Sequence, residues 1–257
     1  MISLWTAATG MESMKFKIEV IANNLANTNT DGFKKTSVDF NDLLYQYKKL
    51  PMQQDNPTGT SVGLGAKVAG TTIEHSQGSL KITDVQTDWA IDGRGFFELI
   101  DPVTGVMTYT RNGSFKLDDQ GRLVSVNGYL LNPQITIPTN LRFSHIGEDG
   151  RVYTNDTVTG EIQIAGQINV ALFPNTAGLQ ALGNSMYRPT LASGSAVLST
   201  PKQSGAGRVV GGALESSNVQ IVQEMVDLIT TQKAFDTNSK VITVSDKMMD
   251  TANNLTR

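Results

Sequence analysis

Residues 4–25 read LWTAATGMESMKFKIEVIANNL, and the spacing of apolar residues in this stretch predicts how the chain begins. Apolar side chains recur at alternating intervals of three and four residues. This is the a/d pattern of a helix that packs against another helix. We therefore expect a helix over about residues 2–27 with an interface on one side. The expected interface residues are Leu4, Ala7, Met11, Met14, Ile18, Ile21 and Leu25.

The C-terminal end of the chain repeats this pattern. Apolar residues recur at every seventh position from Ile221 to Met249, with further apolar residues beside them. No proline or glycine interrupts residues 215–257, so one long helix is expected, and Ser217 with Gln220 can form a capping box at its start. The expected interface residues are Ile221, Val222, Met225, Leu228, Ile229, Phe235, Ile242 and Met249.

Amphipathic helices that pack on the protein's own core show a similar periodicity, so this alternative has to be weighed. Both predicted helices lie at the ends of the chain, and both are long for a compact domain of this size. These two features favour helices that pair with each other and with further partners.

Between the two ends, the hydrophobic period changes from that of a helix to that of a strand. Turn signals rich in Asp, Asn and Gly separate short β-forming runs. The predicted strands are 96–100, 107–111, 114–117, 123–126, 128–131, 134–137, 151–154, 162–164 and 169–173.

The fold class follows from this order of elements. We predict an α+β fold in which the N- and C-terminal helices form a discontinuous coiled-coil domain with an inserted all-β domain of short antiparallel strands. Residues 1–70 are expected to hold the first helix and an extended, hairpin-like insert, 71–200 a β-rich outer domain, and 201–257 a linker and the second helix. The Gly-, Pro-, Ser- and Thr-rich stretches 51–70 and 190–212 are expected to be linkers.

The composition argues against several classes of function. A net charge of −3 without a basic cluster argues against a nucleic-acid partner. No apolar run approaches the roughly 18 residues of a membrane span. The absence of cysteine excludes disulfides, thiol catalysis and zinc–thiolate sites. The N-terminus lacks the basic and apolar regions of a cleaved secretory signal, so any export is expected to use another route.

Candidate chemical sites are few and weak. His75 and His145 are the two histidines, and they show no metal-ligand spacing. The segment GLGAK at 63–67 lacks the spacing of a phosphate-binding loop, and GRG at 93–95 fails the dinucleotide-binding pattern. We therefore expect no enzyme: no catalytic, metal-binding or cofactor-binding residue, and no cofactor.

Eight short motifs are distributed along the whole chain. They are IANNLAN at 21–27, NTDGFKK at 29–35, QGSL at 77–80, WAIDGRGFF at 89–97, YTRNGSF at 109–115, LESSNV at 214–219, EMVD at 224–227 and TQKAF at 231–235. In this order they resemble the rod and hook family of axial proteins of the bacterial flagellum. The family positions that the resemblance carries over are Asn23, Asn24, Leu25, Asn27, Gly32, Phe33, Asn218 and Gln232.

The resemblance implies a structural subunit rather than an enzyme. In such a subunit the end helices pair in an inner domain that lines an export channel, and copies stack into a helical tube that transmits torque. The length of 257 residues resembles the distal rod branch more than the hook branch, although the insert at 45–65 is only loosely similar to that branch. A proximal rod subunit or another axial subunit is the alternative.

The resemblance also implies partners and a location. The expected partners are further copies of this chain, proximal rod proteins, the hook protein, the P-ring and L-ring bushing proteins, and the flagellar type III export apparatus, with no nucleic acid and no membrane insertion. The expected location is the rod of the flagellar basal body in the periplasm, reached without a cleaved signal peptide.

Two local expectations accompany the resemblance. Asn23, Asn24 and Asn27 are expected to bond backbone groups where the first helix ends, the alternative being that they are solvated helix-end residues. Trp89 is expected to be buried.

A function from another class is a secreted β module with helical arms that binds a glycan such as peptidoglycan, suggested by the Thr- and Asn-rich composition. A cell-wall enzyme would in addition need an acid/base pair in a cleft.

Overall fold

The computed structural model describes residues 2–49, 59–137, 141–156 and 161–255, and its fold is α+β, as the sequence predicts. The chain divides into two compact units. The helical unit comprises Met1–Ala26, Thr36–Ile73 and Gln220–Arg257, and the β-rich unit comprises Asn27–Lys35 and Glu74–Val219. The chain therefore crosses between the units four times.

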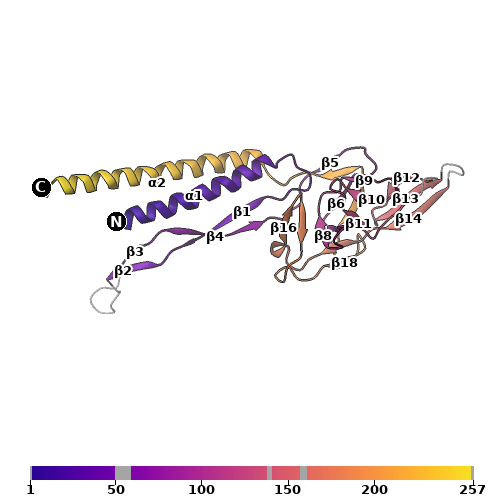
Figure 1. Ribbon diagram of the computed structural model, residues 1–257, viewed down its shortest axis with the longest axis horizontal. Helices are drawn as coiled ribbons and strands as arrows, with labels where there is room; N and C mark the ends of the chain where they lie inside the picture. The colour runs from indigo at the N-terminus through magenta and orange to yellow at the C-terminus, as the bar shows by residue number, and fades with distance from the viewer. Residues whose placement is uncertain (1, 50–58, 138–140, 157–160, 256–257) are drawn as a thin grey trace. The chain divides into compact units, whose positions relative to one another are not determined.

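Two helices dominate the helical unit. Helix α1 (Ile2–Ala26) agrees with the predicted N-terminal helix, and α2 (Ile221–Leu255) lies beside it (Figure 1). Helix α2 begins later than the capping box at Ser217 would place it. The Ser217 Oγ instead accepts a hydrogen bond from the Val219 N–H at 3.3 Å, and the Glu224 N–H donates to Gln220 O at 3.0 Å in the first turn of the helix.

Small and polar side chains are among the most deeply buried residues of α1 and α2. On α2 the buried residues are Glu224, Thr231 and Ser245, which are spaced by multiples of seven. On α1, Gly10 faces Asn238, and a Cβ atom at position 10 would lie 2.9 Å from the Asn238 Nδ2. Glycine in a helix interior costs about 1 kcal/mol relative to alanine, so its place here reflects a close approach of the two helices.

A long antiparallel arm completes the helical unit. Strand β1 (Thr36–Asp42) pairs with β4 (Ala66–Ile73), and the ladder continues into β2 (Tyr45–Lys49) and β3 (Thr60–Gly63). The first part of β4 and all of β3 lie in the stretch 51–70 that was expected to be a linker, while residues 51–58 lie outside the described part of the chain. Strand β2 is exposed along its whole length.

The β-rich unit is built on a nine-stranded antiparallel sheet. The main path follows the order β16-β17-β8-β7-β11-β10-β9, and β15 joins β7 to β18. These strands are β7 Phe96–Ile100, β8 Met107–Thr110, β9 Phe115–Leu117, β10 Leu123–Ser125, β11 Leu130–Asn132, β15 Val170–Leu172, β16 Gln180–Gly183, β17 Met186–Arg188 and β18 Val197–Ser199.

Smaller ladders surround this sheet. Strand β5 (Leu80–Ile82) pairs with β20 (Ala213–Glu215), and β6 (Trp89–Asp92) pairs with β19 (Arg208–Gly211). A three-stranded sheet follows the order β12-β13-β14, and a 3-10 turn, η1, lies before β16. These elements are β12 Leu141–Ile146, β13 Arg151–Asp156, β14 Ile162–Gln167 and η1 Thr176–Gly178.

Most predicted strands coincide with observed ones, and two differences have physical reasons. The run 134–137 contributes only an isolated bridge between Thr136 and Arg122, next to Pro133, which has no N–H to donate to a ladder. The stretch 190–212, expected to be a linker, holds β18 and β19 because neighbouring strands supply partners that its Gly-rich sequence does not reveal.

The core of the β-rich unit is aromatic. The Trp89 side chain is fully buried, as expected, with ring centroids 5.2 Å from Phe115 and 5.8 Å from Phe143. Phe97 meets Phe115 edge-on at 5.3 Å. Such pairs add to the free energy gained by burying their apolar area.

Candidate functional site

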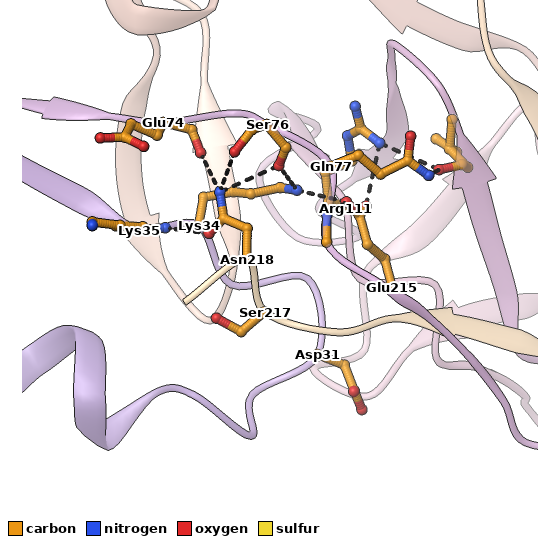
Figure 2. A network of polar contacts seen from close by, with 12 residues as sticks. Asp31, Lys34, Lys35, Glu74, Ser76, Gln77, Arg111, Glu215, Ser217 and Asn218 are labelled. Atoms are coloured by element: carbon orange, nitrogen blue, oxygen red, sulfur yellow. Dashed lines mark hydrogen bonds and ion pairs between the residues drawn. The ribbon is translucent and has the colours of Figure 1, made fainter. Parts of the chain in front are cut away.

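Four segments that are distant in sequence meet at one polar junction of the β-rich unit (Figure 2). They are residues 31–35, residues 74–78, Arg111, and residues 215–218. Three of the eight motifs named above contribute directly, and the fourth segment runs into a further motif, QGSL. The motifs are thus brought together by tertiary structure.

The Glu215 carboxylate lies at the centre of this junction with its side chain fully buried. The Lys34 Nζ is 2.6 Å from its Oε1, and the Arg111 Nη1 is 3.2 Å from its Oε2. The Gly78 N–H also donates to Oε1, at 3.0 Å. One carboxylate therefore pairs with two cations and a backbone donor, and we call Lys34, Arg111 and Glu215 the buried triad.

Both cations of the triad are themselves desolvated. The side chain of Lys34 is fully buried and that of Arg111 is 4% exposed. Burial lowers the pKa of Lys34, and the Glu215 carboxylate acts in the opposite direction. Burial likewise lowers the pKa of Arg111.

Backbone carbonyls accept further hydrogen bonds from the cations. Lys34 Nζ donates to Ser76 O at 2.7 Å, and Arg111 Nη2 donates to Gly93 O at 2.9 Å. The Arg111 guanidinium also lies 5.3 Å from the centroid of the Phe96 ring. These contacts help to hold the positive charge that one carboxylate does not balance.

Asn218 ties the same segments together through its amide. Its Oδ1 accepts a hydrogen bond from the Lys35 N–H at 2.7 Å. Its Nδ2 donates to Glu74 O at 2.8 Å and to the Ser76 Oγ at 2.9 Å. Such a set needs both a donor and an acceptor on one side chain, which an amide supplies.

Gly32 occupies a backbone position at the junction that other residues would strain. Its φ is +71°, and a Cβ atom there would lie 2.6 Å from the Asn112 backbone N. Its N–H donates to Glu215 O at 2.7 Å. The residue therefore allows the segment after α1 to approach both Glu215 and the turn after β8.

Asn24 has a comparable role in the helical unit. Its Oδ1 accepts from the Thr36 N–H at 3.0 Å, and its Nδ2 donates to Thr36 O at 2.9 Å and to the Glu224 Oε2 at 3.2 Å. The expectation that a helix-end asparagine bonds backbone groups is confirmed for Asn24. Asn27 accepts a hydrogen bond from the Thr30 hydroxyl at 3.2 Å.

The predicted interface residues of α1 mostly face inward in a single chain. Ala7 and Ile21 are buried, while the others are partly buried. The partly buried positions of α1 are Leu4, Met11, Met14, Ile18 and Leu25. The family-motif residue Phe33, in the segment after α1, is also partly buried.

The predicted interface residues of α2 divide into two sets. Leu228, Phe235 and Ile242 are partly buried. The other predicted positions are exposed, together with several further apolar residues of α2. We call this set the apolar face of α2: Ile221, Val222, Met225, Val226, Ile229, Val241, Val244, Met248 and Met249. Gln232 is also exposed.

The arrangement is suited to holding segments together rather than to reaction chemistry. The charged groups of the triad bond one another and backbone atoms, while the Arg111 Nε is buried without a hydrogen-bond partner among the residues that the structure describes. Within the described residues, no group of three or more His, Asp or Glu side chains is placed to hold a metal ion. No helix in the described part of the chain is long and apolar enough to span a bilayer.

Sequence reasoning did not single out the members of the triad as site residues. Each lies within a quoted motif, in a chain where only 18% of residues are charged. Their place inside these motifs was the available signal. Their pairing could not be read from it, because 181 positions separate Lys34 from Glu215 and 104 separate Arg111 from Glu215.

Three family models match the chain. Residues 4–34 match "Flagella basal body rod protein", residues 90–154 match "Flagellar hook protein FlgE/F/G D1 domain", and residues 210–255 match "Flagellar basal body rod FlgEFG protein C-terminal". Each match contains one residue of the triad: Lys34 in the first, Arg111 in the second and Glu215 in the third.

Individual relatives span the whole chain. The flagellar basal-body rod protein FlgG of Borreliella burgdorferi is 41% identical over 100% of this chain and 99% of its own length. The protein of the same name from Caulobacter vibrioides is 40% identical over 99% of each. The flagellar hook protein FlgE of Helicobacter mustelae is 41% identical over 50% of this chain but only 30% of its own length.

Proposed function

The chain belongs to the family of flagellar basal-body rod and hook proteins, and from this premise we propose that it is a structural subunit of the distal rod. In this proposal, copies of the chain assemble into a helical tube that transmits torque from motor to hook and encloses the export channel. The full-length similarity to proteins named FlgG supports the rod rather than the hook. The subunit performs no catalysis.

The observation that carries the self-assembly is the apolar face of α2. Val222 is 77% exposed and Met248 is 62% exposed in a single chain, although α1 already lies against α2. The exposed apolar residues form two groups along α2, from Ile221 to Ile229 and from Val241 to Met249, and groups of this kind mark an interaction surface. We propose that neighbouring copies cover it, with Leu228, Phe235 and Ile242 serving the contact with α1.

The proposed partners follow from the place of the subunit in the rod. They are other copies of this chain, the proximal rod proteins, the hook protein, the P-ring and L-ring proteins and the type III export apparatus. The proposed location is the part of the rod that lies in the periplasm, reached without a cleaved signal peptide.

An aspartate in the apolar face of α2 tests the proposal. Ile229 is 55% exposed, so Ile229→Asp should leave the single chain folded but place a charge in the contact between copies, where its desolvation is costly. We expect the unaltered chain to form tubes at high concentration in sedimentation and electron microscopy, and the variant to remain small.

Val103→Asp is the matched control, because Val103 is 90% exposed and lies in the turn between β7 and β8. It should assemble as the unaltered chain does. Tubes formed equally well by Ile229→Asp would refute the role of this face. An unaltered chain that stays small and sediments with peptidoglycan would instead support a glycan-binding module.

A further inference from the structure

The buried triad sets a condition on how the β-rich unit closes. Lys34 precedes the first strand of the chain, Arg111 follows β8, and Glu215 ends β20, the last strand. Glu215 is therefore the last member of the triad along the chain, and strand β20 also pairs with β5. Until β20 is in place, two cations meet at a buried position without their shared carboxylate.

We infer that Glu215 is the closing counter-ion of the β-rich unit: the segments that carry Lys34 and Arg111 cannot be buried together until β20 brings its carboxylate to them. This inference does not depend on the proposed rod function, because it concerns the folding of one chain.

The physical reason lies in the cost of burying charge. Removing one partner of a buried ion pair is strongly destabilising, because it leaves a charge without compensation. Apolar residues could fill such a place at no loss of stability in many proteins. With the triad in place of apolar residues, burial of the junction depends on Glu215. A chain that lacks residues 213–215 therefore keeps this junction open.

The charge balance of the triad predicts different effects for removing its acid and for removing one of its bases. The triad carries two positive charges and one negative charge. Glu215→Gln leaves two buried cations side by side, whereas Lys34→Met leaves the neutral pair of Arg111 and Glu215. Loss of the acid should therefore be worse than loss of one base, and Lys34→Met should partly rescue Glu215→Gln.

Urea unfolding of full-length variants tests this order. Glu215→Gln should raise the unfolding equilibrium constant of the β-rich unit by about 100-fold or more, the scale expected when a buried pair is broken. Glu98→Gln is the matched control, because Glu98 is equally buried but bonds the Tyr109 hydroxyl at 3.0 Å and the Asn132 amide instead of a cation. Its effect should be clearly smaller.

The inference can still be tested if the single variant Glu215→Gln does not fold. If Glu215→Gln does not fold, the Lys34→Met, Glu215→Gln double variant should fold. Equal loss in Glu215→Gln and Glu98→Gln, or a double variant that is no more stable than Glu215→Gln, would overturn the inference, because either result shows that charge compensation does not decide closure.

The pH profile separates charge from mere packing. Without its carboxylate partner, Lys34 keeps the positive charge of Arg111 beside it, with His75 also within electrostatic reach, so Lys34 should release its proton at a lower pH. The stability of Glu215→Gln should therefore rise between pH 7 and 9.5 more than that of the unaltered chain. The double variant, which has no Lys34, should not show this extra rise; a rise of the same size in all three would contradict the inference.

Discussion

The fold lowers the pKa of His75. Its ring lies edge-on to Phe96 at 5.3 Å and to Tyr187 at 5.1 Å. Burial lowers its pKa from 6.5 to about 4, and the positive charges of Lys34 and Arg111 act in the same direction. A neutral histidine beside the triad therefore avoids adding a third positive charge to the junction.

This shift predicts how stability depends on pH. Below pH 6.5 the unfolded chain takes up a proton at His75 that the folded chain refuses until about pH 4. The free energy of unfolding should therefore fall as the pH drops from 6.5 to 4, by at most about 3 kcal/mol from this residue, since one pKa unit corresponds to about 1.4 kcal/mol. Urea unfolding across this range measures the change.

His75→Phe supplies the comparison for this prediction. The phenyl ring can keep the contacts with Phe96 and Tyr187 but cannot bind a proton. The decline of the variant with falling pH should be shallower than that of the unaltered chain, because position 75 no longer takes up a proton on unfolding. Parallel curves for the two proteins would show that His75 is not responsible.

At the scale of the element, α2 combines two surfaces of opposite character. The buried positions Glu224, Thr231 and Ser245 are polar, while the apolar face of α2 is exposed. An isolated chain would normally bury the apolar side. The exposed apolar face indicates that α2 makes apolar contacts outside its own chain. Gly10 lets α1 lie close to α2 at Asn238.

Gly10 allows a test of this close approach. Gly10→Ala should gain up to about 1 kcal/mol of helix propensity, but the new methyl group meets the end of the Asn238 side chain at 2.9 Å. We therefore expect Gly10→Ala to stabilise the helical unit more in an Asn238→Ala background than in the unaltered chain. Thermal unfolding followed by far-ultraviolet circular dichroism measures the four proteins of this cycle. Equal effects in both backgrounds would show that the two positions are not coupled.

At the scale of the whole molecule, the two units differ in how their interiors are built. The β-rich unit has a continuous aromatic and aliphatic core around Trp89 and Phe97. The helical unit buries few large side chains: among its described apolar residues, only Ala7 and Ile21 are buried. The helical unit should therefore open more readily in an isolated chain, since local opening is easiest where few apolar contacts are buried.

Brief trypsin digestion of the dilute chain should reveal this difference. The first cuts are expected after Lys48 and Lys49, which are exposed on β2, and then within α2. The bonds after Lys34 and Arg111 should be spared longest, because both side chains are buried in the triad. Mass spectrometry of the early fragments identifies the sites, and cleavage after Arg111 as early as after Lys49 would contradict the expectation.

The sequence by itself determined the helical ends, the β-rich middle and the family, because each rests on short-range information. The heptad spacing from Leu4 to Leu25 is local, and so are the turn signals between strands. The same reasoning predicted a hairpin-like insert before residue 70 without naming its strands, and it missed β19 among other strands, whose residues pair with the distant strand β6.

Only the tertiary structure decided which residues meet and which face of α2 stays exposed. Lys34, Arg111 and Glu215 form one site although long stretches of chain separate them, and no local periodicity encodes such a pairing. The apolar heptad of α2 indicated an interface without indicating its partner. In the single chain, Glu224, Thr231 and Ser245 of α2 are buried and Leu228, Phe235 and Ile242 are partly buried, while the apolar face of α2 is left for another surface.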